Sequence, residues 1–292
     1  MKYPIDKGFG RLVNIKTPLN KFILYMAYFF LSIMPKKLKD KNLSVTKISI
    51  DSYDKKKIKI YKLTPKSNNI SSTIFFIHGG GFVFKGGPNH YKIAKEYAKR
   101  SSAELYFVDY RLAFNNKYET PLLDTLEAYK FMLKNKTTDN IIIIGDSAGG
   151  FLSINLINKL HNLELMLPNK QLIVYPVIDP NMTTPSMKKY IDTPMWDAKL
   201  NKKMWYYYNK NNHTVSPLEY NDYSYYPKTY IETAEFDCLH DEGILFYNKL
   251  KTANKNVLLN ETYKTMHGYD FYINHPISIN SINKRIDFIK NA

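Results

Sequence analysis

The chain has 292 residues, 44% of them apolar, and a formal net charge of +16. This length and apolar content suit one large α/β domain or two small ones, and we favour a single domain, 1–292. Arginine, whose forked side chain serves most specific phosphate and base recognition, supplies only four of the 42 basic residues, so the charge argues against nucleic-acid binding. The charge indicates a lysine-rich solvated surface, with weak attraction to acidic surfaces as the alternative.

Two features bear on the compartment of the protein. The single cysteine, Cys238, permits no internal disulfide, which suits the reducing cytoplasm. The segment 22–34 is apolar and flanked by lysines, but it is too short to span a bilayer comfortably, and Pro35-Lys36-Lys37 stands where a signal peptide needs small residues. We expect a helix that packs over the main domain; a helix lying in a membrane interface and a true anchor or signal are the alternatives.

Downstream, the hydrophobic pattern predicts a mostly parallel sheet. Two alternating segments, 43–50 and 57–63, favour an antiparallel pair. From residue 73 onward, apolar strands alternate with helix-like stretches, which gives a mostly parallel sheet covered by helices on both faces. The expected strands are 73–77, 104–108, 140–144, 171–175, 229–235 and 257–263, and the expected helices lie near 89–101, 120–135, 147–161, 242–253 and 278–290.

The interval 178–227 breaks this alternation. It contains five prolines and many aromatic residues, but no clear strand. A structureless loop of that length is uncommon inside a compact domain, so we expect an inserted lid with short helices. Its aromatic side chains either line an acyl or aryl pocket or form the lid's own core.

The stretch 141–150 predicts a strand, a sharp turn and a helix in direct succession. Its four isoleucines suit a buried strand, and Gly145-Asp146-Ser147-Ala148-Gly149 follows without a spacer. A serine at such a turn has a strained backbone and an exposed hydroxyl, and Gly145 and Gly149 remove side chains that would clash there. The pattern indicates a nucleophile elbow at Ser147; an ordinary Gly/Ser turn is the alternative.

A serine nucleophile also needs donors for the oxyanion that develops during the reaction. His78-Gly79-Gly80-Gly81 directly follows the strand 73–77. The bare amides of Gly80 and Gly81, together with that of Ala148, would form an oxyanion hole. A glycine turn with only a structural role is the alternative.

The serine needs a histidine as its base and an acid that orients this histidine. Both are expected after the serine in the chain, and the acid is expected before the histidine. His267 lies just past the last expected strand, at the edge where open parallel sheets place their chemistry, and we assign the base to it. Asp237 ends the preceding strand and is placed to accept a hydrogen bond from the His267 ring. Asp241 and Glu242 are rivals, but they open a helix, and helix capping explains Asp241. His240 is then a loop residue near the acid.

These motifs together resemble the hormone-sensitive-lipase-like family of α/β-hydrolases, microbial esterases and lipases that share an HGGG oxyanion motif. The resemblance covers residues from about 70 to the C-terminus and is carried by 78–82, 109–113, 145–150, 175–176, 216–218, 234–237, 241–243 and 267–268. It implies the α/β-hydrolase fold, the triad Ser147, Asp237 and His267, and an N-terminal helix that joins the lid, whose elements are then about 1–40 and 178–227. The chain departs from the family pattern at Phe114, Cys238 and His240, where we expect altered loop rigidity and not loss of the reaction.

The sequence therefore predicts a serine carboxylic-ester hydrolase that acts on short- to medium-chain acyl esters through an acyl-enzyme. This chemistry requires neither a metal nor an organic cofactor, and its partner is a small-molecule acyl ester. An amidase or deacetylase with the same triad is one alternative, and a non-catalytic ligand-binding protein on the same scaffold is another, which the presence of His267 disfavours. The acyl length, the leaving group and the oligomeric state, including a homo-oligomer, stay open.

Overall fold

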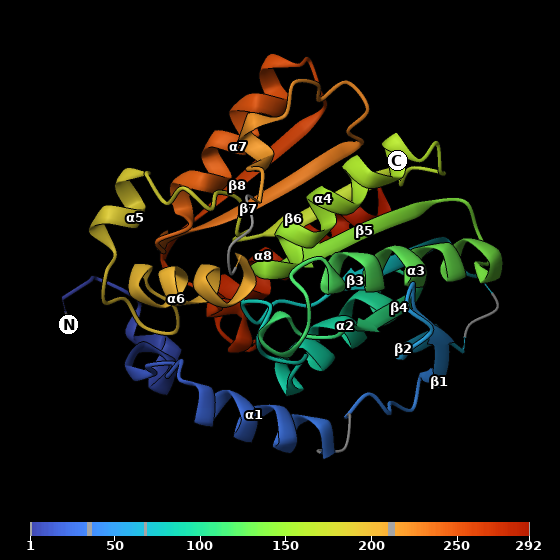
Figure 1. Ribbon diagram of the computed structural model, residues 1–292, viewed down its shortest axis with the longest axis horizontal. Coiled ribbons are helices and arrows are strands. Elements are labelled where there is room, and N and C mark those ends of the chain that lie inside the picture. The colour runs from blue at the N-terminus through green and yellow to red at the C-terminus, as the bar shows by residue number, and fades with distance from the viewer. Residues whose placement is uncertain (1, 34–36, 67–68, 210–213, 292) are drawn as a thin grey trace.

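The computed structural model describes residues 2–33, 37–66, 69–209 and 214–291, which are built around an eight-stranded sheet (Figure 1). The strand order is β1-β2-β4-β3-β5-β6-β7-β8. β1 pairs antiparallel with β2 and β2 antiparallel with β4, whereas every other neighbouring pair is parallel, which confirms the expected sheet. The strands are β1 Leu43–Asp51, β2 Lys57–Pro65, β3 Ser72–Ile77, β4 Ala103–Asp109, β5 Ile141–Asp146, β6 Lys170–Val174, β7 Lys228–Phe236 and β8 Val257–Met266.

Helices cover both faces of the sheet. Figure 1 shows α3, α4 and α7 on one face and α2 and α8 on the other, as the alternating pattern predicts. The α-helices are α1 Lys21–Ile33, α2 Pro88–Arg100, α3 Thr120–Asn135, α4 Ala148–Asn162, α5 Pro185–Lys189, α6 Ala198–Asn209, α7 His240–Thr252 and α8 Pro276–Lys290. The short 3-10 turns are η1 Lys7–Asn14, η2 Ala113–Asn115, η3 Pro217–Glu219 and η4 Tyr269–Phe271.

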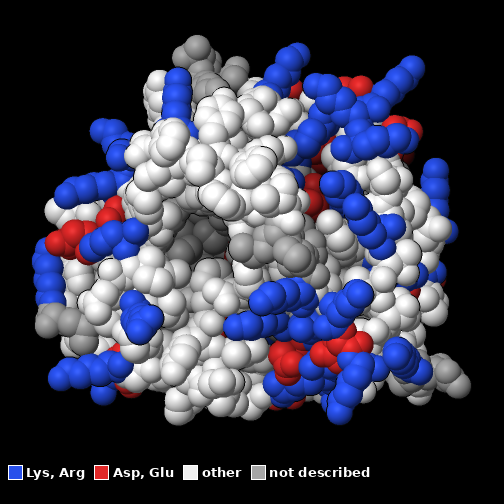
Figure 2. All heavy atoms as spheres, turned by 90° about the horizontal axis from the view of Figure 1, so that it is seen from below, with Lys and Arg blue, Asp and Glu red and all other residues white. Residues whose placement is uncertain are grey.

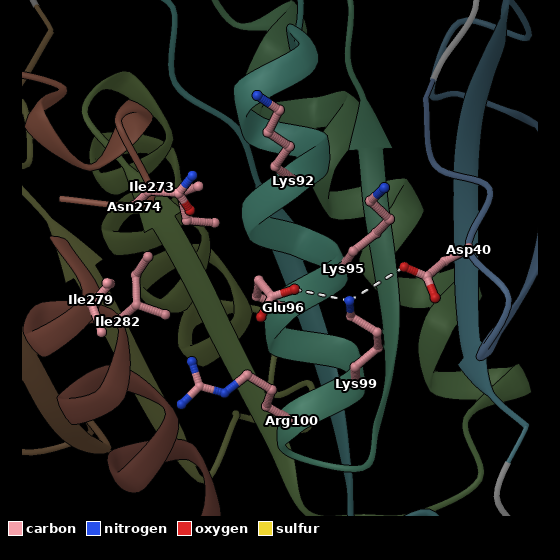
Figure 3. A pocket seen from close by; sticks show the side chains of 10 residues that line it. All are labelled: Asp40, Lys92, Lys95, Glu96, Lys99, Arg100, Ile273, Asn274, Ile279 and Ile282. Carbon is pink, nitrogen blue, oxygen red and sulfur yellow. Dashed lines mark ion pairs between the residues drawn. The ribbon is translucent and has the colours of Figure 1, made fainter. Parts of the chain in front are cut away.

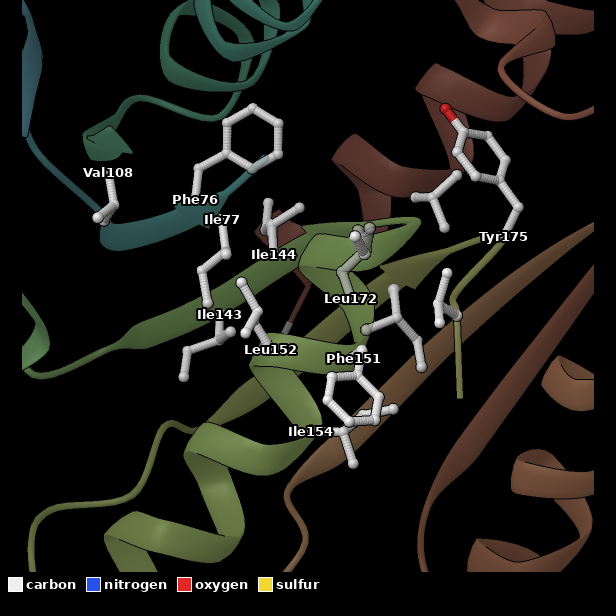
Figure 4. Close-up of a cluster of buried hydrophobic side chains, with 14 of the residues drawn as sticks. Phe76, Ile77, Val108, Ile143, Ile144, Phe151, Leu152, Ile154, Leu172 and Tyr175 are labelled. Carbon is white, nitrogen blue, oxygen red and sulfur yellow. The ribbon is translucent and has the colours of Figure 1, made fainter. Parts of the chain in front are cut away.

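The centre of the core lies where β3 and β5 run side by side beneath α4. Every residue of both strands is buried, and the side chains of 74–77 and 141–144 are apolar on both faces of the sheet. Figure 4 shows Phe76 and Ile77 of β3, Ile143 and Ile144 of β5 and Leu152 of α4 within one apolar cluster. Close packing of this kind fixes the carboxyl ends of β3 and β5, where the loop 78–81 and the turn at Ser147 begin.

The interval 178–227 holds α5, α6 and η3, in line with the expected short helices. The N-terminal segment is hydrogen-bonded to it: the Met195 amide donates to the Ile15 carbonyl at 2.8 Å, and the Thr17 hydroxyl donates to the Met195 carbonyl at 2.7 Å. Figure 1 shows the two segments on the same side of the sheet. We refer to 2–20 and 178–209 together as the cover layer.

Two aromatic side chains of the cover layer pack on the main domain. Trp205 and Tyr208 of α6 pack on the ring of Phe151, with centroids 5.3 and 5.8 Å away, and on Phe82. Trp205 is only 5% exposed. These rings therefore attach the insertion to α4 and to the loop after β3.

α1 matches the expected helix 22–34 up to Ile33; residues 34–36 lie outside the described ranges. Leu24 is fully buried, and the rings of Tyr25 and Tyr28 contact Phe114 with centroids 5.3 and 5.9 Å away, so one face of α1 packs on the domain. Within the described ranges, no helix has the length and the apolar character needed to span a bilayer.

A buried ion-pair network joins α8 to the end of the sheet. Arg285 of α8 lies between Glu232 of β7, with which it pairs directly, and Asp270 of η4, whose Oδ2 is 2.6 Å from its Nη1. Burial raises the pKa of Glu232, but the charge of Arg285 outweighs it and holds that pKa below its usual value. Because Asp270 follows His267 by three residues and accepts a hydrogen bond from Tyr175 at 2.6 Å, the network also anchors the loop that carries His267.

We expect Arg285→Ala to lower the free energy of unfolding by about 3 kcal/mol or more, because it leaves two buried carboxylates without their cation. Arg100→Ala is the matched control: Arg100 also reaches α8, through Asn283, but it is exposed, so its loss is expected to cost less than about 0.5 kcal/mol. Urea unfolding followed by circular dichroism measures both. Equal effects of the two substitutions would show that the network contributes nothing specific.

Candidate active site

Ser147 occupies the sharp turn between β5 and α4. Its backbone has φ 52° and ψ −119°, a left-handed conformation that costs energy for any residue other than glycine. The turn is held by hydrogen bonds at both ends: the Ser147 amide donates to the Val174 carbonyl at 2.9 Å, and its carbonyl accepts from the amide of Val177 at 3.0 Å. The expected strand, turn and helix at this serine are therefore present.

The three residues expected to form the triad come from three distant segments and meet in one row. Ser147 Oγ is 3.0 Å from His267 Nε2, and His267 Nδ1 is 2.6 Å from Asp237 Oδ2. The other carboxylate oxygen of Asp237 accepts from the Leu239 amide at 3.0 Å, and the side chain is fully buried. A carboxylate at Nδ1 keeps the proton there, so Nε2 faces the serine as an acceptor.

The loop after β3 brings bare amides to the same place. Gly80 and Gly81 have φ 115° and 59°, and both line the cavity that contains Ser147. Among the described residues, no hydrogen-bond acceptor is bonded to either amide. His78 shapes this loop, because its Nδ1 donates to the Gly79 carbonyl at 2.6 Å and its Nε2 accepts from the Gly86 amide at 3.2 Å. Burial lowers the pKa of His78 to about 3, so the ring stays neutral.

Asp146, which precedes the nucleophile position, is held by a histidine that the sequence pattern did not single out. His90 Nδ1 accepts from the Gly87 amide at 3.1 Å, which leaves Nε2–H to donate to Asp146 Oδ2 at 3.1 Å. Burial raises the pKa of Asp146, but His90 outweighs it and lowers that pKa below the usual value. His90 is recognised as the partner of Asp146 only from the contact between α2 and the turn. The spacing of residues in the sequence does not reveal that contact.

The two rival acids have other partners. Asp241 does not cap α7: the N-cap is Leu239, and the Asp241 carboxylate instead accepts from the Ser186 amide at 2.7 Å. His240 is the first residue of α7 and not a loop residue. Glu242 turns inward and accepts from the amides of Ile178 and Asp179 at 2.8 and 3.0 Å, which fixes the chain as it leaves β6.

A cavity of about 200 Å³ opens over Ser147 and His267. Its walls are largely apolar, and the cover layer contributes Thr17, Met195 and Trp196. A β-carbon on Gly81 would lie 2.8 Å from the Trp196 ring, so this indole closes the space beside the glycine amides. Among the described residues, no group of three or more His, Cys, Asp or Glu side chains is arranged to hold a metal ion.

A family model of the alpha/beta hydrolase fold matches residues 74–271. The chain therefore belongs to the α/β hydrolases, and its resemblance to the hormone-sensitive-lipase-like members is confirmed. The Vegetative-specific protein H5 of Dictyostelium discoideum is 32% identical over 213 residues, which cover 67% of this chain and 62% of H5. This chain thus spans less than two thirds of the length of that relative.

Two further relatives match over almost the whole chain. Carboxylesterase NlhH of Mycobacterium tuberculosis is 25% identical over 302 residues, which cover 99% of this chain and 89% of NlhH. The structure of esterase LipW from Mycobacterium marinum has a TM-score of 0.88 at 18% identity and covers 98% of this chain and 95% of LipW. The structural likeness shows the shared fold.

The buried carboxyl of Glu242 predicts a pH dependence of stability. Burial raises its pKa from 4.5 to about 8, so between these values the folded chain holds a proton that the unfolded chain has lost. The free energy of unfolding should therefore fall as pH rises from about 5 to 8, by at most about 1.4 kcal/mol per pH unit from this group. We expect Glu242→Gln to flatten that slope and the exposed control Glu164→Gln to keep it, as measured by urea unfolding at several pH values. An unchanged slope in Glu242→Gln would rule out this origin.

Proposed function

We propose that this protein is a serine carboxylic-ester hydrolase that cleaves short- to medium-chain acyl esters. The row of contacts from Ser147 through His267 to Asp237, at 3.0 and 2.6 Å, is the observation that carries the proposal. Membership of the α/β hydrolases and the match to carboxylesterase NlhH support it. The acyl group would occupy the largely apolar cavity over Ser147.

The reaction would proceed in two halves. His267 Nε2 takes the proton of the Ser147 hydroxyl, and the serine oxygen attacks the ester carbonyl carbon while the amides of Gly80, Gly81 and Ala148 donate to the oxyanion. The bond to the leaving oxygen then breaks, and His267 gives its proton to the departing alcohol. Water, deprotonated by His267, attacks the acyl-enzyme, releases the carboxylic acid and restores the serine. Asp237 keeps the imidazole in one tautomer throughout.

The size of the cavity favours a short acyl chain. A volume of about 200 Å³ is below that of common drug-sized ligand pockets, and the Trp196 ring limits it next to Gly81. The cavity walls are apolar, so each methylene that fits is worth about 0.8 kcal/mol. Chain length should therefore be selected by space and not by polar contacts.

We expect Ser147→Ala to lose at least about 10³-fold of kcat/KM on p-nitrophenyl acetate and butyrate, because the groups of a triad act as a unit. Ser224→Ala, at an exposed serine, is the control and should keep full turnover. A fluorophosphonate should label the wild-type chain on the peptide that contains Ser147 and leave the alanine variant unlabelled. Retained turnover or label in Ser147→Ala would exclude this mechanism, and p-nitroanilides in the same panel separate ester from amide preference.

A second substitution tests the origin of chain-length selection. We expect Trp196→Phe to raise the ratio of kcat/KM for p-nitrophenyl hexanoate to that for the acetate by about threefold or more, since the smaller ring leaves room for additional methylenes. Trp205→Phe is the matched control, because Trp205 packs on Phe151 and does not line the cavity. An equal ratio in both variants would mean that Trp196 does not limit the acyl site.

A further inference from the structure

α1 is apolar on two faces, and only one of them packs on the domain. The packed face includes Leu24, which is fully buried, and Tyr28. The other side of α1 is an exposed stripe of large apolar side chains with 40 to 73% of their surface accessible: Phe22, Tyr25, Met26, Phe29, Phe30 and Ile33. Tyr25 lies at the edge of this stripe, where its ring also contacts Phe114. We refer to these six residues as the α1 stripe.

The spacing of the α1 stripe is that of one continuous helix face. Its members follow each other at intervals of three, one, three, one and three residues, which places them along one side of an α-helix. An ordinary surface helix has polar residues on this side, because exposed apolar side chains gain nothing in water. A contiguous apolar patch with a surrounding of charges is typical of a surface that meets another phase or partner.

The charges around the α1 stripe are positive. Residues 2–41 contain eight lysines and one arginine but only two acids, Asp6 and Asp40, and Lys16, Lys21, Lys37, Lys39 and Lys41 are exposed. Figure 2 shows the molecule from the side on which α1 lies in Figure 1: a broad uncharged area surrounds a hollow, and lysines and arginines gather around it with a smaller share of acidic side chains among them. This distribution is complementary to an anionic surface.

The neighbouring helix α2 adds basic groups. Lys99 of α2 pairs with Asp40, seven residues after the end of α1, and with Glu96. Asp40, Glu96 and Lys99 line a surface pocket together with Lys92 and Lys95, and Figure 3 shows that neither Lys92 nor Lys95 forms an ion pair with the residues drawn there. These ammonium groups are therefore available to anionic headgroups beside Asp40, in the segment that follows α1.

The α1 stripe is close to the entrance of the catalytic cavity. Thr17, which lines the cavity, precedes α1 by four residues. On the packed side of α1, the Lys85 ammonium lies 5.4 Å from the centroid of the Tyr28 ring, and Lys85 also lines the cavity. α1 thus lies beside the rim through which substrate enters, and a flat surface on the α1 stripe would lie about one helix diameter from that rim.

We propose that the α1 stripe inserts into the interface of an anionic lipid bilayer, with the surrounding lysines on the headgroups and the rim of the cavity at the membrane surface. A helix of this length lies in the interface plane and does not cross the bilayer. The apolar stripe provides the part of the affinity that salt does not screen, and the lysines provide the part that salt does. Docking needs no turnover, so it is independent of the proposed esterase activity.

The test is sedimentation of the full chain with vesicles of equal parts phosphatidylglycerol and phosphatidylcholine. We expect binding at low salt that weakens but persists in high salt, and much weaker binding to pure phosphatidylcholine. Phe29→Ser combined with Phe30→Ser should lower the partition coefficient at least about tenfold, since two large apolar side chains no longer leave water. Leu163→Ser combined with Met166→Ser is the control, because these side chains are 48 and 47% exposed after α4 and lie outside the stripe. Ser147→Ala should bind like the wild type.

A second readout does not depend on removing apolar groups. Both native tryptophans are 5% exposed, so a Phe29→Trp variant reports on the stripe, and brominated phosphatidylcholine mixed with phosphatidylglycerol should quench its fluorescence. Leu163→Trp should not be quenched. The variants at positions 29, 30, 163 and 166 should match the wild type in turnover of p-nitrophenyl acetate and in circular dichroism spectrum.

Three results would overturn the proposal. The first is a wild-type chain that stays in the supernatant with anionic vesicles at low salt. The second is equal binding by the Phe29/Phe30 and Leu163/Met166 variants. The third is a lipid-free dimer in analytical ultracentrifugation that the Phe29/Phe30 substitutions convert to a monomer while vesicles bind neither form, which would assign the stripe to a second copy of the chain.

Discussion

Backbone contact at the Ser147 turn is the constraint on which the rest of the site depends. A β-carbon on Gly149 would lie 2.0 Å from the Ile77 carbonyl oxygen, and one on Gly145 would lie 2.3 Å from the Gly149 carbonyl oxygen. β3, β5 and α4 therefore meet with no side chain between them. The same fit brings the loop after β3 against the turn, since a β-carbon on Gly79 would lie 3.1 Å from Ser147 Cβ. Steric fit thus sets the distance from Ser147 to the glycine amides, independently of His267.

Two buried glutamates near this edge show how the fold accommodates carboxyl groups in two ways. Glu232 faces Arg285, and the cation keeps its pKa below the usual value despite burial. Among the described residues, Glu242 has two backbone amides as its donors and no cation, so burial prevails and raises its pKa to about 8. Hydrogen bonds from neutral groups do not replace a counter-charge when water is excluded. One glutamate stabilises the histidine loop as an anion, and the other holds the end of β6 largely as a neutral acid.

The sequence predicts those parts of the structure that short-range patterns determine. The strand, turn and helix at 141–150 and the position of each parallel strand follow from local periodicity, and the meeting of Ser147, Asp237 and His267 follows from their places at the carboxyl ends of strands. Local patterns do not predict the contacts between one element and another. The contact of His90 with Asp146 and the position of Trp196 over Gly81 depend on how helices and insertion pack. The sequence of a helix as apolar as α1 likewise does not reveal which of its faces stays exposed.

The cover layer links the two surfaces that a substrate would meet. Its halves are joined by the hydrogen bonds of Met195 with Ile15 and Thr17, and Met195 and Trp196 reach the cavity while α1 begins only four residues after Thr17. If α1 fixes the depth of the chain in a bilayer interface, Thr17 brings the rim to nearly the same depth. Esters with longer chains partition into bilayers, so they would reach the cavity without crossing water. The apolar walls would then select by length, so α1 would bring the substrate and the cover layer next to it would set the fit.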